Sequence, residues 1–151
     1  MIAAASGEVL SFPILSALVI LPLIGSIVVA LLGKSRPEWI KLGALTSSVT
    51  TGALSLWLLG AFKSGEAGFQ FVSQHLWISQ WGISWHLGVD GISLFLVVLT
   101  GILFPLVIVG IDPHHNETSY FAWMLLLQAG VMGSFLALDL FLFFVMFEIV
   151  L

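Results

Sequence analysis

The chain has 151 residues, of which 60% are hydrophobic and only 8% are charged, and its mean hydropathy is +1.16. These proportions leave too few polar side chains to cover a folded core of this size in water. Eight acidic against four basic residues exclude a nucleic-acid partner, and the absence of cysteine excludes disulfides and iron–sulfur ligation. Composition therefore predicts a protein whose partner is the lipid bilayer and which holds no redox centre.

Charged residues divide the sequence into apolar intervals of the length that a bilayer requires, about 20 residues of helix. A further run, 140–151, is too short to cross, and an unfinished helix end would leave backbone groups unpaired in hydrocarbon. We therefore expect an all-α polytopic membrane protein forming one membrane domain over residues 1–151, cut inside its fifth helix as a fragment. The complete spans are expected at residues 12–33, 42–62, 89–111 and 119–138.

Basic residues are concentrated in the first connection between spans, which contains Lys34, Arg36 and Lys41, whereas the second contains only Lys63. Loops rich in Lys and Arg stay on the cytoplasmic side of a membrane. This distribution predicts a cytoplasmic first loop and places the N-terminus and the long loop 63–88 outside.

The outer loop 63–88 is rich in aromatic residues around a turn residue, Gly82. Alternating aromatic residues on both sides of a glycine indicate a short β-hairpin. Two interpretations stay open: a hairpin that contacts a neighbouring subunit, or an aromatic belt at the lipid headgroups. The aromatic residues are Phe69, Phe71, Trp77, Trp81 and Trp85.

Glu148 is the candidate for proton translocation. It follows Asp139 by nine positions, which on a helix is a rise of about 13–14 Å, close to the middle of a hydrocarbon layer about 30 Å thick. An ionised carboxylate at that depth is costly unless it is paired, hydrated or protonated, so such residues usually mark proton or ion paths. The alternative is that Glu148 lies at an interface as a solvated anchor.

Asp90 and Asp139 each stand where an expected span begins. Aspartate at a helix start accepts hydrogen bonds from free amides and favours the positive end of the helix dipole. We therefore assign structural roles to both residues. The adjacent His114 and His115 do not predict a metal site, because neighbouring histidines rarely converge on one ion.

Three stretches resemble one family, the antiporter-like membrane subunits of respiratory complex I, NADH:quinone oxidoreductase. The first runs from Trp85 to Leu94, contains Val89-Asp90-Gly91-Ile92-Ser93 and leads into Leu103-Phe104-Pro105-Leu106. The second runs from Tyr120 to Asp139, contains Leu126-Leu127-Gln128-Ala129-Gly130 and ends Ala137-Leu138-Asp139, and the third is Phe143 to Glu148. The second and third are closer to chain M than to chain L of that family. The resemblance covers the second half of the chain in detail and the first two spans in layout.

The resemblance implies a proton-conducting subunit of about fourteen helices, built from two inverted five-helix repeats, of which this chain would be the N-terminal part. Glu148 would be the family's buried glutamate, paired with a lysine on a later helix outside this sequence. NAD, FMN, iron–sulfur clusters and quinone would be held by other subunits, and chains of the L and N type would be neighbours. This chain would contribute no cofactor site and no catalytic residue, and would be inactive alone.

The location implied is a bacterial plasma membrane in preference to a thylakoid membrane, with several crossings. Two other functions remain as alternatives. A multisubunit cation/proton antiporter uses related chains without electron transfer, and a structural membrane protein would have no use for Glu148.

Overall fold

A computed structural model describes residues 13–32, 37–65, 68–78, 80, 82–113 and 116–151. Several residues named above lie outside this described part: Phe12, Gly33, Lys34, Arg36, Trp81, His114 and His115.

Seven elements make up the described chain. In order they are α1 (Ile14–Leu31), α2 (Pro37–Ala61), β1 (Gln70–Ile78), β2 (Ile83–Val89), α3 (Gly91–Gly110), α4 (Glu117–Leu136) and α5 (Leu140–Val150).

The helices α1 to α4 are each long and apolar enough to cross a membrane, whereas α5 has 11 residues. The predicted fold class, with four spans, a short fifth helix and a hairpin, is confirmed. The largest difference is at α2, which begins at Pro37 instead of residue 42. Its first turn contains Glu38, a charge that the positive end of the helix dipole favours, so the helix extends past its apolar part.

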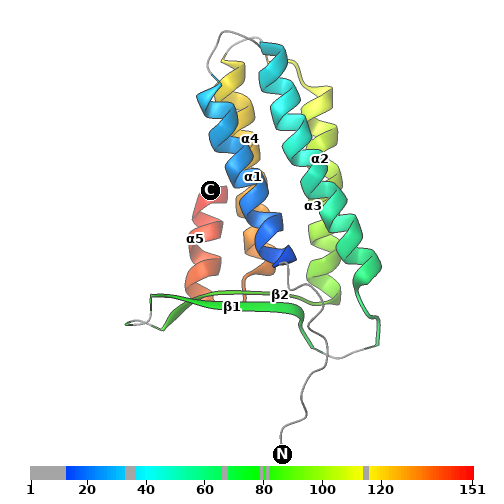
Figure 1. Cartoon of the computed structure of the whole chain (residues 1–151), viewed down its shortest axis with the longest axis vertical. Coiled ribbons are helices and arrows are strands. Elements are labelled where there is room, and N and C mark those ends of the chain that lie inside the picture. Colours follow the sequence, from blue (N-terminus) through cyan, green and yellow to red (C-terminus); the bar gives the residue numbers. More distant parts are fainter. Residues whose placement is uncertain (1–12, 33–36, 66–67, 79, 81, 114–115) are drawn as a thin grey trace, which may run out of the picture.

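The four long helices stand side by side as a bundle, and the hairpin lies across one end of it (Figure 1). In the bundle α1 packs against α2 and α4, α2 also packs against α3, and α4 also packs against α5. The short helix α5 rises from the hairpin end, and the chain reaches its C-terminus about midway along the bundle (Figure 1). We call the two ends of the bundle the hairpin end and the loop end.

The strands β1 and β2 form the antiparallel hairpin predicted for the outer loop. Gly82, before β2, has a φ of +67°, in the left-handed region that favours glycine. The register shifts between Gln70 and Ser73, where Phe71 has a φ of +54°. The strand β2 is largely buried and β1 is the exposed edge.

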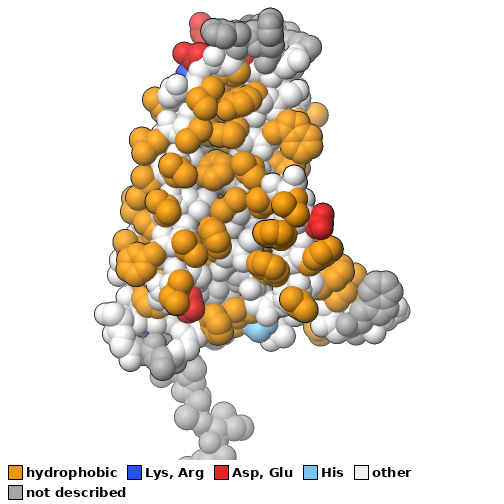
Figure 2. All heavy atoms as spheres, turned by 180° about the vertical axis from the view of Figure 1, so that it is seen from behind, with side chains coloured by type: hydrophobic (Ala, Val, Ile, Leu, Met, Phe, Trp, Pro, Cys, Tyr) orange, Lys and Arg blue, Asp and Glu red, His pale blue; other side chains and the backbone are white. Residues whose placement is uncertain are grey.

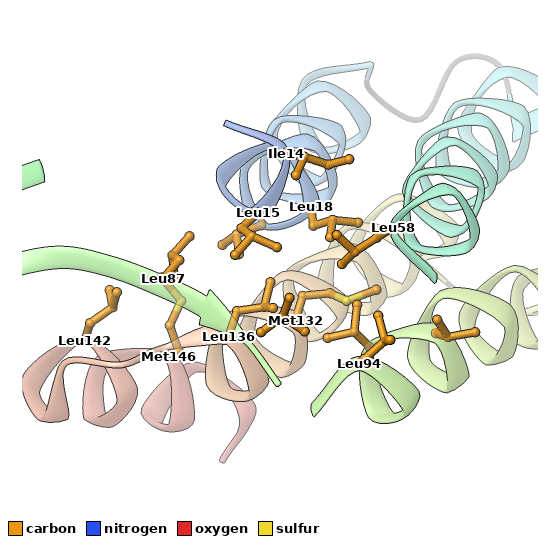
Figure 3. Packing of buried hydrophobic residues seen from close by; sticks show 14 residues of the cluster. Ile14, Leu15, Leu18, Leu58, Leu87, Leu94, Met132, Leu136, Leu142 and Met146 are labelled. Atoms are coloured by element: carbon orange, nitrogen blue, oxygen red, sulfur yellow. The ribbon is translucent and has the colours of Figure 1, made fainter. Parts of the chain in front are cut away.

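Buried apolar residues form two clusters. The hairpin-end cluster joins all five helices to β2, and its side chains point toward one another in Figure 3. The loop-end cluster contains residues from each of the four long helices, α1, α2, α3 and α4. The hairpin-end cluster comprises Ile14, Leu15, Leu18, Val19, Leu58, Leu87, Val89, Leu94, Val97, Val98, Met132, Leu136, Leu142 and Met146; the loop-end cluster comprises Val29, Ile40, Ala44, Ile108, Phe121, Ala122 and Leu125.

The outer surface of the bundle is also apolar. Apolar side chains cover most of the face in Figure 2, from one end of the bundle toward the other. Residues such as Leu99 and Trp123 point outward from the middle parts of their helices, with 58% and 68% of their surface exposed. An apolar exterior around helices of membrane-spanning length is the surface of a membrane protein.

Candidate functional site

The helix that carries Glu148 begins at a capped N-terminus. Asp139 is the N-cap of α5, and its Oδ1 accepts hydrogen bonds from the backbone N–H groups of Phe141, at 2.9 Å, and Leu142, at 3.2 Å. An aspartate in this position satisfies amides that have no partner within the helix. The structure therefore places Asp139 at the helix start, where the sequence predicted it.

The second carboxylate oxygen of Asp139 ties α5 to the hairpin. Asp139 Oδ2 accepts hydrogen bonds from the backbone N–H and the hydroxyl of Ser84 in β2, both at 3.3 Å. The hydrogen bond from Leu142 lowers the pKa of Asp139 most, and the bonds from Ser84 and Phe141 add to it. Since the folded pKa is lower than the ordinary value of 3.8, this stabilisation is present above that value and is lost as the pH falls through the folded pKa.

The inner face of α5 packs closely on α4. Leu142 and Met146, one turn apart, are buried. Met146 lies against two glycines of α4: a Cβ added to Gly133 would lie 2.6 Å from the Cγ and the sulfur of Met146, and one added to Gly130 would lie 3.1 Å from the Met146 carbonyl oxygen. Small residues let membrane helices approach in this way. This contact fixes the rotation of α5 about its axis.

With that rotation, Glu148 points away from the bundle. It lies two positions after Met146, which on a helix is about 200° around the axis from the buried face. Its side chain is exposed, and no hydrogen bond or ion pair of Glu148 is found among the described residues. The resemblance implies a buried glutamate. Among the described residues Glu148 is exposed, because the close α4–α5 contact turns the carboxylate outward, and its burial in the complete subunit stays a prediction.

The surroundings of Glu148 on α5 are aromatic. Phe144 lies one turn before it and is exposed on the same face, and Phe143 and Phe147 stack with their ring centroids 5.7 Å apart. Glu148 is the one charged residue in α5. The outer face of this helix is thus an apolar surface with a single carboxylate. Glu148 stands three residues before the C-terminus, which lies about halfway along the bundle (Figure 1).

Asp90 forms a capping box at the start of α3. Its Oδ1 accepts a hydrogen bond from the Ser93 N–H at 2.7 Å, and the Ser93 hydroxyl oxygen accepts one from the Asp90 N–H at 3.0 Å. The hydrogen bond from the Ser93 backbone is the main cause of a lowered pKa for Asp90. Asp90 therefore joins the end of β2 to α3, and lies apart from Glu148, on another helix.

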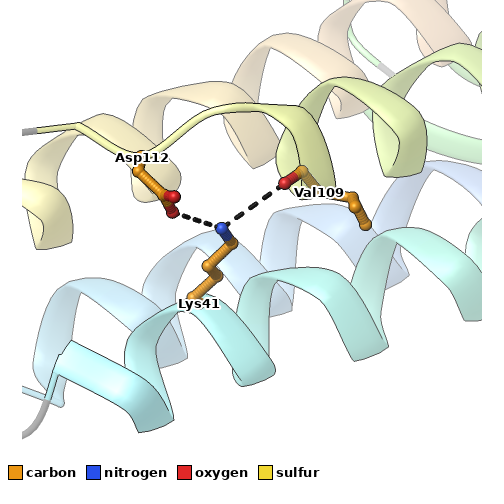
Figure 4. A network of polar contacts seen from close by, with 3 residues as sticks. All are labelled: Lys41, Val109 and Asp112. Atoms are coloured by element: carbon orange, nitrogen blue, oxygen red, sulfur yellow. Dashed lines mark hydrogen bonds and ion pairs between the residues drawn. The ribbon is translucent and has the colours of Figure 1, made fainter.

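An ion pair that was not predicted from the sequence joins α2 to the connection after α3 at the loop end. Lys41 Nζ lies 2.5 Å from Asp112 Oδ1, and it also donates a hydrogen bond to the Val109 carbonyl at 3.4 Å (Figure 4). Lys41 is in the first turns of α2, and Asp112 follows α3. The topology predicted from the sequence already places Lys41 and Asp112 on the same side of the membrane, and their opposite charges were the feature from which the pair could have been predicted.

These features define a polytopic membrane protein with a carboxylate exposed on the apolar face of one helix. No protein-family model matches the chain. It is 39% identical over 141 residues to NADH-ubiquinone oxidoreductase chain 4 of Arabidopsis thaliana, covering 91% of this chain and 28% of the relative. It is also 39% identical over 145 residues to NADH-quinone oxidoreductase subunit M of Rhodobacter capsulatus, covering 89% and 27%.

A third relative is subunit M of Rickettsia typhi, which is 33% identical over 152 residues, covering 94% of this chain and 30% of the relative. The chain belongs to the subunit M/chain 4 family of NADH-quinone oxidoreductases. It spans about 30% or less of the length of these relatives.

Proposed function

We propose that this chain is part of the proton-translocating membrane subunit of complex I, and that Glu148 takes up and releases the translocated proton. The observation that carries the proposal is the single carboxylate on the apolar outer face of α5, about halfway along the bundle. The membership of the chain in the subunit M/chain 4 family supports it.

The outward direction of Glu148 bears on how it would work. A carboxylate facing hydrocarbon is costly while it is ionised and unpaired, so it requires a proton, water or a cation next to it. Nothing in the described residues supplies a cation. The partner we propose is a lysine from a helix that covers the Phe144–Glu148 face, from the remainder of the subunit. The carboxylate would then be buried in the assembled subunit.

The direction of transport follows from the two ends of the bundle. Lys41 and Asp112 lie together at the loop end, which agrees with a common side for the first and third connections. We assign the loop end to the cytoplasm, because the first connection is rich in Lys and Arg, and the hairpin end to the outside. Protons would enter from the loop end and leave at the hairpin end.

The driving reaction would occur in other subunits. Their NAD, FMN, iron–sulfur clusters and quinone would change the charge along the membrane arm, which would shift the pairing between Glu148 and its lysine. Neighbouring chains of the L and N type would complete the arm. The relatives reported above are named as oxidoreductase chains, which favours this function over a cation/proton antiporter.

The proposal is tested by the variant Glu148→Gln in the complete subunit, with the intact complex reconstituted in lipid vesicles. Glutamine keeps the size of the side chain but cannot release a proton. We expect the complex to assemble and the number of protons moved per NADH oxidised to fall to a small fraction of the wild-type value. Wild-type pumping by this variant would overturn the proposal.

Two further variants separate the proton-carrying role from the effect of removing a charge. Glu38→Gln makes the same chemical change at an exposed position in the first turn of α2, and we expect normal pumping. Glu148→Asp keeps a carboxylate, one methylene shorter, and we expect it to pump more than Glu148→Gln.

A further inference from the structure

A layer of polar residues lies inside the bundle between the two apolar clusters. On α2, Ile40 and Ala44 belong to the loop-end cluster and Leu58 belongs to the hairpin-end cluster. On α4, Phe121 and Leu125 belong to the loop-end cluster, and Met132 and Leu136 belong to the hairpin-end cluster. Between the two clusters, beside buried apolar residues such as Phe104 and Ala129, the four helices bury six polar residues. These six are Ser26, Ser48, Thr51, Ser55, Thr100 and Gln128.

Four of these six side chains have a partner in the protein. Ser26 donates to the Ala122 carbonyl at 2.7 Å, and thereby joins α1 to α4. The hydroxyls of Thr51, Ser55 and Thr100 donate to carbonyls of their own helices, at 2.7 to 2.9 Å. These groups are therefore satisfied without any ligand.

Ser48 and Gln128 are the exceptions. Both side chains have no exposed surface, and neither the Ser48 hydroxyl nor either amide atom of Gln128 has a hydrogen-bond partner among the described residues. Burying a hydroxyl and a primary amide without partners is unfavourable, and native proteins rarely leave such groups unsatisfied. The cost applies fully inside a membrane protein, where lipid offers no hydrogen bonds.

The two side chains lie at the same height in the bundle. Ser48 follows the first residue of α2 by eleven positions, and Gln128 follows the first residue of α4 by eleven. Both helices start at the loop end and pack against each other, so both residues lie about 16–17 Å along their helices. Ser48 continues the buried stripe of Ile40 and Ala44, and Gln128 continues that of Phe121 and Leu125. Each side chain therefore belongs to the inner face of its helix.

We propose that the interior of the bundle holds a bound water molecule between Ser48 and Gln128. Water can accept from the Gln128 amide nitrogen, donate to its oxygen and bond the Ser48 hydroxyl, about three bonds, as is typical of buried water. The short side chains of Ser48, Thr51 and Ser55 take less space than Ile40 and Leu58 on the same helix. The six residues of the polar layer include no carboxylate and no histidine, so a neutral ligand such as water matches the groups that they offer.

The site differs in kind from a proton path. The apolar clusters lie on both sides of the layer and separate it from the two ends of the bundle. Neither Gln128 nor Ser48 has a side chain that ionises near neutral pH. The water is thus a fixed component that holds α2 to α4. This inference rests on the packing of the bundle and is independent of the role proposed for Glu148.

The test is a cryo-electron microscopy map of the intact complex at a resolution that shows ordered water. We expect density for water within about 2.7–3.2 Å of a Gln128 amide atom and of the Ser48 hydroxyl. In the variant Gln128→Leu, whose side chain is similar in size and apolar, that density should be absent. In the control Ser55→Ala, whose hydroxyl is already bonded to Gly52, it should remain.

A map without that water, or with Gln128 bonded directly to a protein atom instead, would overturn the inference. The wild-type map decides it alone, even where a variant does not assemble. Pumping measurements separate this inference from the proposed function. If the map shows no water at the site but Glu148→Gln has lost pumping, only the inference about the water is overturned.

Discussion

The two ends of the bundle are held together in different ways. At the hairpin end, Leu87 and Val89 are completely buried, and the Trp85 indole N–H donates to the Ser16 hydroxyl at 2.9 Å. The backbone N–H of Leu138 also donates to the His86 carbonyl at 2.8 Å, next to the Asp139 contacts with Ser84. At the loop end, Lys41 of α2 pairs with Asp112 in the connection after α3, and these side chains are 32% and 84% exposed.

This difference concerns the helix that carries Glu148. The helix α5 starts at the hairpin end, where buried apolar contacts and hydrogen bonds fix its first turn against β2. Exposed ion pairs, by contrast, contribute little, because water and salt screen them. The hairpin end is therefore the part of the bundle that sets the position of the carboxylate. At the loop end the four long helices share the buried loop-end cluster, but the connection after α3 is tied to α2 by an exposed ion pair.

The largest effect is expected from Asp139→Ala, which removes both the N-cap of α5 and its link to β2. The amides of Phe141, Leu142 and Ser84 lose their acceptors, so their hydrogen exchange in the assembled complex should accelerate, on the order of tenfold. Hydrogen–deuterium exchange with mass spectrometry measures it. Asp139→Asn keeps an oxygen acceptor and should exchange much more slowly than the alanine variant. Equal protection in all three proteins would contradict the anchoring role of this residue.

A smaller effect is expected from Trp85→Phe, which keeps an aromatic ring but removes the hydrogen bond to Ser16. A neutral hydrogen bond of this kind stabilises a protein by about 1 kcal/mol, so exchange of the β2 amides should accelerate about fivefold. Trp77→Phe is the matched control, because Trp77 is 55% exposed on the edge strand. An identical result for both tryptophans would show that the indole contact with α1 does not hold the hairpin.

The sequence predicted the elements more fully than the contacts between them. Uncharged intervals gave four spans and the start of α5 at residue 140, because lipid imposes a minimum helix length. Aromatic alternation around Gly82 predicted the hairpin. The direction of Glu148 was not predictable, since it depends on the packing of Gly130 and Gly133 against Met146, a contact between two helices.

The candidate site shows the same limit. The type and the spacing of Asp139 indicated a helix cap, and capping depends on neighbouring residues, so it can be inferred locally. The contact of the same carboxylate with Ser84 joins residues 55 positions apart, and no local pattern encodes it. Gln128 was singled out from the sequence only as part of the motif Leu126–Gly130, because the lack of a hydrogen-bond partner among the described residues is a property of the three-dimensional packing.

The smallest effect is expected from Lys41→Met, which removes the ion pair at the loop end and keeps an apolar stem of similar length. An exposed pair contributes about 0–1 kcal/mol, so exchange at the start of α2 should change less than fivefold, and the change should shrink at high salt. Asp112→Asn should give a similar result, and the double variant should add little to either. A larger loss than in Asp139→Ala would reverse the comparison, because the loop end would then be the firmer of the two.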